Sequence, residues 1–174
     1  MSAVVFTGFA RNNLYANRTI YEALKGMGEA DFTALRPGFF PSLAETLNHN
    51  YLVDVFYMDA LVQGGEGRAI FERPNLTDVS ALSRAQANVD ARLVAFCAGL
   101  AETDLASEVH IPRQEGMTVE RVDALLSHLF QHQIHHRGQA HVQIGDAGTA
   151  PPQLDEYFLE YMRAPLAAEV QKTS

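Results

Sequence analysis

Five of the seven histidines in this sequence fall within fourteen consecutive residues, HLFQHQIHHRGQAH, which begin at His128. Imidazole binds transition metals and transfers protons near neutral pH more readily than any other side chain. The segment is internal and interleaved with Leu129, Phe130 and Ile134, so it belongs to the fold and is not a terminal tag. The chemistry that it indicates depends on which imidazoles share one face of a helix.

A helical projection separates these histidines. The inward direction is set by an apolar stripe that comprises Val122, Leu125, Leu126, Leu129 and Ala140. At about 100° per residue, His136 lies roughly 40–50° from the centre of the stripe and His132 roughly 80–90°. His128 and His135 lie more than about 100° away, toward solvent. The pattern therefore predicts that His132 and His136 face the interior.

His132 and His136 are four residues apart, which places their Cβ atoms about 6 Å from each other on one face. Two imidazoles at that distance can bind one divalent ion. A third ligand should come from another helix, and the only histidine in the first three predicted helices is His49, within TLNHNYLVD. Three histidines with a position left for water or substrate are typical of a catalytic metal site, because structural sites use four protein ligands.

Other interpretations of these residues remain open on spacing alone. A His-x-x-x-His pair on a helix often arises by chance, and both histidines could be structural or exposed. His49 alone also fits an ordinary, partly buried, hydrogen-bonded histidine. His110 and His141 are expected to be structural or solvated. Tyr51 and Tyr57 could line a pocket, although aromatic residues at helical spacing are more often part of a core.

The elements that must position these side chains are helices. Glycine and proline clusters divide the chain into segments too long for strands. Ser42 and Glu45 have the spacing of a capping box at the start of the second segment, whose apolar residues surround the whole circumference. The sequence predicts an all-α four-helix bundle with a short extra C-terminal helix, the five helices covering about 10–27, 41–62, 77–101, 118–144 and 153–163. Two short stretches, RAIFE and EVHIP, could be extended and pair with each other.

Composition limits the classes of partner. The 174 residues, of which 47% are hydrophobic, fit a single domain over residues 1–174. A net charge of -8 argues against a nucleic-acid partner.

No apolar run approaches the roughly 18 residues of a membrane span, and we expect no secretory signal. A single cysteine, Cys97, cannot form an internal disulfide, which favours the cytoplasm, and we expect a buried, inert thiol there.

Three separated motifs resemble those of a known group of proteins. HQIHHRGQAH, FPSLAETLNHNYLVDVFYMDAL and YANRTIYEAL occur in the order found in the DinB-like (damage-inducible, YfiT-related) superfamily of metalloenzymes, and APPQLDEYFLEYM extends the likeness to the last part of the chain. The resemblance implies a four-helix bundle, usually a homodimer, with one divalent metal held by three histidines. Carried over residue by residue, these ligands are His49, His132 and His136.

The resemblance also implies a function. Relatives in that superfamily include low-molecular-weight thiol S-transferases and a mycothiol-dependent maleylpyruvate isomerase. We therefore expect a metal-dependent enzyme, with Zn or Ni, that activates such a thiol on a small electrophilic substrate. The alternatives are a metal-dependent hydrolase, a non-catalytic metal or small-molecule binding protein of a stress response, and a purely structural dimer without metal. Catalytic residues other than the ligands are not assigned.

Residues beside the ligands carry weaker expectations. Gln139 could orient a ligand imidazole or a water molecule. Arg137 is expected to form a surface ion pair, and Gly138 to allow close helix approach or simply to pack. Asp54 is the best carboxylate candidate near His49 in sequence, but its helical angle differs, so its role is open. Because imidazole binds metal only when neutral, occupancy is predicted to fall below about pH 6.

Overall fold

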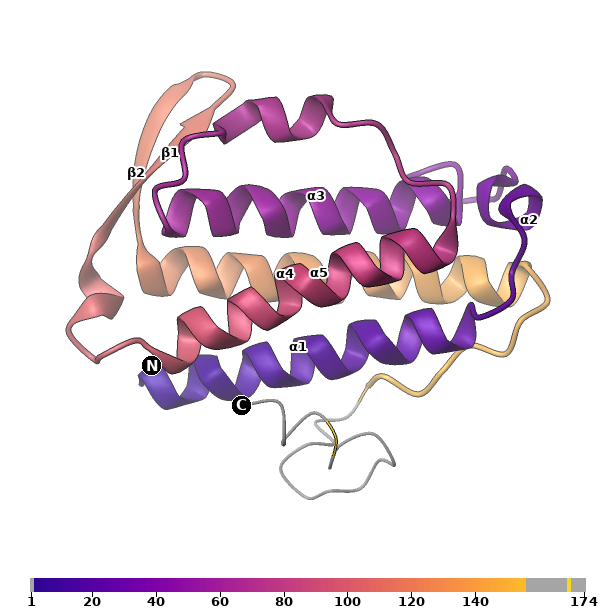
Figure 1. Cartoon of the computed structure of the whole chain (residues 1–174), viewed down its shortest axis with the longest axis horizontal. Coiled ribbons are helices and arrows are strands. Elements are labelled where there is room, and N and C mark those ends of the chain that lie inside the picture. The colour runs from indigo at the N-terminus through magenta and orange to yellow at the C-terminus, as the bar shows by residue number, and fades with distance from the viewer. Residues whose placement is uncertain (1, 156–168, 170–174) are drawn as a thin grey trace.

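The fold is built from long helices whose apolar stripes face one another. The computed structural model of the chain describes residues 2–155 and residue 169. Within this part of the chain, four long helices run alongside one another (Figure 1): α1 (Ala3–Ala23), α3 (Leu43–Leu61), α4 (Val79–Ala98) and α5 (Val122–Asp146). The main contacts between them join α1 to α4 and α3 to α5. The predicted all-α four-helix bundle is confirmed.

Side-chain caps begin two of these helices. Ser42 Oγ accepts a hydrogen bond from the backbone N–H of Glu45 at 3.2 Å, which is one half of the predicted capping box. Asp78 Oδ1 accepts from the backbone N–H of Ala81 at 2.7 Å. Each cap satisfies an amide group that the first helical turn leaves unpaired, and so fixes where the helix starts.

The first helix begins earlier than the sequence pattern indicated. It starts at Ala3, whereas the prediction began it near residue 10. Ala3, Phe6 and Ala10 are buried and continue the helix's apolar stripe toward its N-terminus. The prediction missed them because Ala3, Val4 and Val5 form a uniformly apolar run with no visible helical period.

A β-hairpin precedes the histidine-rich helix. The strands β1 (Glu108–Arg113) and β2 (Gly116–Arg121) pair antiparallel, and Gly116 in the turn has a φ of 127°, which favours glycine. EVHIP is thus extended as predicted. RAIFE is not its partner, because it lies in the 3-10 helix η1 (Gly67–Glu72). Helix α5 starts at Val122, later than predicted. The predicted start near residue 118 falls within β2, which is mostly exposed and shows no burial pattern that distinguishes it from the first turn of a helix.

The remaining elements cover α3. Most of its residues are buried, which confirms burial on several sides, because α4, α5, η1 and the short α2 (Glu29–Thr33) all contact it. A second 3-10 helix, η2 (Asp104–Ala106), leads into the hairpin.

Of the predicted C-terminal helix, residues 153–155 are not helical, and the remainder lies outside the described residues. Among the described helices, none is sufficiently long and apolar to cross a membrane.

The core consists of two apolar clusters with polar side chains between them. One cluster lies toward the hairpin and includes Phe6, Met58, Leu93 and Leu126, while the other includes Leu24, Leu43, Leu82 and Ile144. Between them each long helix contributes two polar residues four positions apart. This buried polar layer consists of Asn13, Asn17, Asn50, Asp54, Gln86, Asp90, Gln133 and Arg137.

Candidate metal centre

Three histidines converge between α3 and α5. His49 comes from α3, and His132 and His136 come from adjacent turns of α5. One ring nitrogen from each lies within 4.8 Å of the other two. Among the histidine, cysteine and carboxylate side chains of the described residues, these three histidines lie close enough together to hold a metal ion. The structure therefore brings together the three residues that the sequence singled out.

The geometry of the three rings fits binding of one shared metal ion. His49 Nε2 and His132 Nε2 are 3.0 Å apart, and the three ring centroids are 4.3–5.0 Å from one another. Two nitrogens that bind one Zn²⁺ at about 2.0–2.1 Å in a tetrahedral site lie about 3.4 Å apart. The observed spacing is slightly smaller. Because two facing lone pairs repel each other, a cation or a proton has to lie between these nitrogens.

The environment favours neutral imidazoles. Burial, followed by the neighbouring His136, lowers the pKa of His49 to about 4. Burial and the surrounding histidines, His136 first, lower the pKa of His132 to about 3. Burial also lowers the pKa of His136, against the opposing effect of the hydrogen bond that His136 donates to Gln139. All three side chains are thus in the protonation state that metal binding requires.

Gln139 fixes the orientation of one ring. Its Oε1 is 2.8 Å from His136 Nδ1 and can only accept, so His136 carries its hydrogen on Nδ1 and leaves Nε2 free to bind a metal. The amide nitrogen of Gln139 then donates to His135 Nε2 at 3.0 Å. These contacts support the expectation that Gln139 orients a candidate ligand.

A substitution at Gln139 tests this role. Gln139→Ala is expected to weaken metal binding about 10- to 100-fold, because His136 loses the acceptor that fixes its tautomer. Calorimetric titration with Zn²⁺ would measure the change. Gln139→Glu keeps an accepting oxygen and should bind nearly as well as the wild type, and Gln131→Ala, at an exposed position of the same helix, provides a matched control. Unchanged affinity in Gln139→Ala would show that the hydrogen bond has no such role.

An aromatic side chain that the sequence did not indicate covers one side of the group. The ring centroid of Phe40 is 4.5 Å from that of His49 and 5.6 Å from that of His136. Its backbone carbonyl accepts a hydrogen bond from Gln143 Nε2 at 2.8 Å, and Gln143 Oε1 accepts one from Thr46 at 2.7 Å. Phe40 precedes α3 in a segment without helical period, so only the fold reveals that it lies here.

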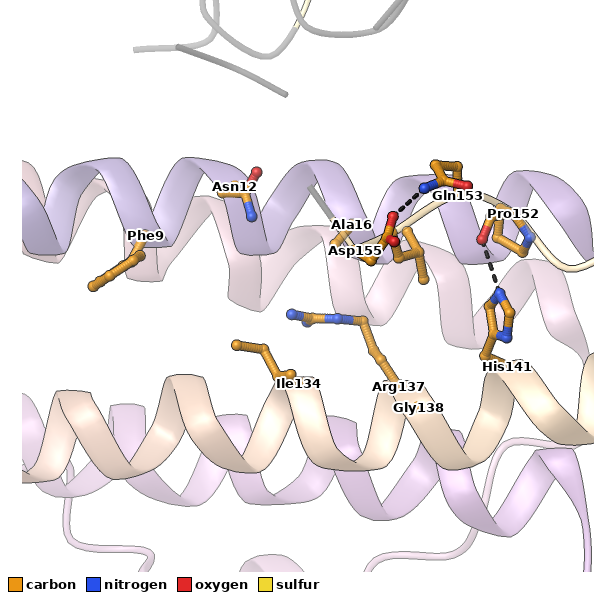
Figure 2. A pocket seen from close by; sticks show the side chains of 11 residues that line it. Phe9, Asn12, Ala16, Ile134, Arg137, Gly138, His141, Pro152, Gln153 and Asp155 are labelled. Atoms are coloured by element: carbon orange, nitrogen blue, oxygen red, sulfur yellow. Dashed lines mark hydrogen bonds between the residues drawn. The ribbon is translucent and has the colours of Figure 1, made fainter. Parts of the chain in front are cut away.

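The other histidines lie where the projection placed them. His128 and His135 are exposed, and so is His110 on β1. His141 Nε2 is 3.0 Å from the carbonyl oxygen of Pro152, a structural contact (Figure 2). The expectation for Cys97 is also confirmed, since it is 1% exposed and burial raises the pKa of its thiol to about 12.

Two expectations next to the ligands were wrong. Arg137 is 6% exposed and belongs to the buried polar layer, so it forms no surface ion pair. Gly138 does not allow close helix approach, because a Cβ atom there would meet nothing within 4 Å. It borders a pocket of about 550 Å³ between α1 and α5, which Phe9, Ile134 and the segment at Pro152 also line (Figure 2). None of the three clustered histidines lines that pocket.

The open question of Asp54 is partly resolved. It is 1% exposed and accepts a hydrogen bond from Gln86 Nε2 at 2.8 Å, so it belongs to the buried polar layer and not to the histidine group. The sequence did contain a signal for this layer, namely paired polar residues four positions apart on otherwise apolar helix faces.

Comparison with known proteins places these features in context. The model of the DinB family matches residues 1–171 of the chain. The structure is similar to that of a DinB-like protein from Bacillus cereus ATCC 10987, with a TM-score of 0.63 and 18% sequence identity over 80% of this chain and 90% of that one. At that identity the likeness shows the fold alone. No curated protein matches the chain in sequence.

Proposed function

The chain belongs to the DinB family, and from that premise we propose that it is a metal-dependent enzyme whose ion is held by His49, His132 and His136. The observation that carries the proposal is the convergence of these three imidazoles from two helices. No fourth protein ligand completes the group among the described residues. A site of three histidines leaves a coordination position for an exogenous molecule, which is the arrangement of catalytic sites.

The finer proposal concerns the exogenous molecule. A divalent ion bound here would supply Lewis acidity, which lowers the pKa of a coordinated thiol or water molecule. The chain's own thiol cannot take part, because Cys97 is buried and keeps its proton. We propose that a low-molecular-weight thiol from solution is the cosubstrate and that it is transferred to a small electrophile. The cytoplasm, which the single cysteine favours, would supply such a thiol.

The neighbouring residues support this chemistry. Phe40 shields the imidazoles of His49 and His136 from water on one side. The histidine group contains no carboxylate that could serve as a general base for water among the described residues. A thiol, whose pKa is about 8.5 before coordination, needs less help to lose its proton than water does. This difference favours the thiol transferase over the hydrolase.

An assay of thiol transfer tests the proposal. Protein loaded with Zn²⁺ or Ni²⁺ would be mixed with chlorodinitrobenzene and with glutathione, cysteine or coenzyme A in turn. We expect metal-dependent turnover with at least one thiol, and its loss in His136→Ala. Turnover of ester or amide substrates without any thiol would instead identify a hydrolase. Saturable binding of metal and thiol without turnover would identify a binding protein.

The pH dependence of metal occupancy follows from the site's electrostatics. The sequence alone predicted a fall below about pH 6. Because the pKa values of His49 and His132 are lowered to about 4 and about 3, protons compete with the metal only at lower pH. Occupancy is therefore expected to stay level from pH 8 to about pH 5 and to fall as the pH drops through about 4. Elemental analysis after dialysis at each pH would measure it, and a midpoint near 6.5 would indicate solvent-exposed ligands.

A further inference from the structure

The buried polar layer joins all four long helices. Each helix contributes residues at positions i and i+4: Asn13 and Asn17 from α1, Asn50 and Asp54 from α3, Gln86 and Asp90 from α4, Gln133 and Arg137 from α5. None of these side chains is more than 6% exposed. Polar groups buried between two apolar clusters must find their hydrogen-bond partners within the layer.

One carboxylate of the layer is fully satisfied. Asp90 Oδ1 accepts hydrogen bonds from Asn13 at 3.3 Å, from Asn17 at 3.0 Å and from Gln86 at 3.1 Å. Asp90 Oδ2 accepts a further bond from Asn17 at 3.2 Å. Donors thus surround Asp90, as an ionised carboxylate requires.

The single cation of the layer is one turn from Gln133 on α5. Arg137 Nη1 donates to Asn13 Oδ1, to Asn17 Oδ1 at 3.0 Å and to Gln133 Oε1 at 3.0 Å. It reaches Asp90 through the two asparagines of α1. One guanidinium and two carboxylates would leave one uncompensated negative charge in the core if both acids were ionised, and such a charge is costly.

Two buried acceptors in the same place have no donor. Asn50 Oδ1 and Asp54 Oδ1 are both buried and have no hydrogen-bond partner among the described residues. They lie one turn apart on the same face of α3, where side chains are neighbours. Leaving a buried polar atom without a partner destabilises the folded state. The excess charge and both unpaired acceptors therefore coincide at Asn50 and Asp54.

We propose that Asp54 is held as a neutral carboxylic acid whose Oδ1–H group donates a hydrogen bond to Asn50 Oδ1. One proton then converts the unpaired acceptor Asp54 Oδ1 into a donor and provides a hydrogen-bond partner for the second unpaired acceptor, Asn50 Oδ1. It also leaves the layer with one anion, Asp90, and one cation, Arg137.

The groups that face Asp54 agree with this protonation state. They are Tyr21 on α1, Asp90 on α4 and Arg137 on α5. Burial, followed by the charge of Asp90, raises the pKa of Asp54 to about 7, although the nearby Gln133 amide group, the hydrogen bond from Gln86 and the charge of Arg137 oppose the rise. The pKa of Asp90 is raised less, to about 6, since Gln86 and Asn17 bond to its ionised form.

The proton makes Asp54 a positioning residue for the histidine group. His49, His132 and His136 are each followed directly in sequence by a member of the layer. Asn50 Nδ2 donates to Gln133 Oε1 at 2.7 Å, and Gln133 Nε2 donates to the backbone carbonyl oxygen of Asn50 at 3.4 Å. A donor at Asp54 holds the side-chain oxygen of Asn50, Oδ1, toward itself and so directs the Asn50 Nδ2 group toward α5. This consequence rests on the proposed metal site, whereas the protonation of Asp54 does not.

Matched amide substitutions test the assignment. Asparagine resembles a neutral aspartic acid, so Asp54→Asn should fold with an unchanged urea midpoint at pH 6. Asp90→Asn should have a lower midpoint above about pH 6, where Asp90 is ionised in the wild type, because its amide group would face the donors of Asn13, Asn17 and Gln86. Equal losses in the two variants, or a greater loss in Asp54→Asn, would overturn the proposal.

The pH profile supplies a second readout. A folded-state pKa raised from about 3.9 to about 7 means that the stabilisation is complete below about pH 4 and is lost as the pH rises through 7. The wild-type urea midpoint should fall over that range, and the part of the fall that comes from Asp54 should vanish in Asp54→Asn. A profile identical in both proteins would contradict the assignment.

Infrared spectroscopy of the wild type needs no variant to fold. A carboxylic-acid C=O band is expected at pH 6 and should diminish as the pH rises through about 7. Its absence at pH 6 would show that Asp54 is ionised and that a buried water molecule or cation serves the two acceptors. For the positioning role, Asn50→Leu should weaken Zn²⁺ binding about 10- to 100-fold while Asp54→Asn retains it. If the wild type binds no metal, the proposed function fails, but the band and the urea midpoints still decide the state of Asp54.

Discussion

Replacing any one of His49, His132 and His136 with alanine is expected to abolish binding of one divalent metal ion per chain. Among the residues that the structure describes, each contributes one of only three protein donors that lie within 4.8 Å of one another, so no described neighbour can substitute for it. Loss of a residue that merely orients a ligand costs about 10- to 100-fold in affinity, and loss of a ligand should cost more. Elemental analysis of untagged protein purified without chelator would give the metal content, and calorimetry with Zn²⁺ and Ni²⁺ the affinities.

The same helix provides the control for this experiment. His128 is exposed, one turn from His132, with ring centroids 6.2 Å apart. His128→Ala should therefore retain the metal, and circular dichroism would establish that every variant is helical. Metal retained in His132→Ala, or lost equally in His128→Ala, would show that the histidine-rich segment binds ions without a defined site.

Arg137→Met is expected to destabilise the fold by about 3–5 kcal/mol, because it leaves buried Asp90 without its compensating cation. Methionine fills a similar volume but cannot donate to Asn13, Asn17 and Gln133. The cost should increase as the pH rises through about 6, since Asp90 can take up a proton below that pH. Urea denaturation at several pH values would measure the free energy of unfolding.

An exposed arginine serves as the comparison. Arg121 is ion-paired with Asp123 at 2.8 Å, and its side chain is 58% exposed. Arg121→Met should leave the urea midpoint nearly unchanged, because an exposed ion pair contributes little to stability. If Arg137→Met cost as little at pH 8, the carboxylates of the layer would have to be neutral there without the guanidinium.

Residues with a strong helical period could be placed from the sequence. The stripe on α5 ran long enough to orient His132 and His136 inward and His128 and His135 outward. The hairpin could not be recognised, because the alternation of apolar and polar residues in β2 covers only Met117 to Glu120 and its apolar side chains are exposed.

The site's surroundings depended on tertiary contacts that periodicity does not encode. Arg137 appears as a surface residue in any composition-based argument, and only the amide oxygens of Asn13 and Asn17 on α1 and of Gln133 on α5 explain its burial. Phe40 lies in an irregular segment that Gln143 holds from α5. Convergence of His49 with the α5 pair required two helices to pack in one particular register, which the sequence could suggest only by elimination among the histidines and through resemblance.

The layer that divides the core also limits how the helices can slide. A shift of α3 along α5 by one turn, about 5.4 Å, would keep apolar residues against apolar residues. It would also separate Asn50 from Gln133 and leave buried amides without partners. The alignment is thus set in the middle of the bundle, independently of what binds at its edge. The residues around the histidines can therefore vary without the helices losing their alignment.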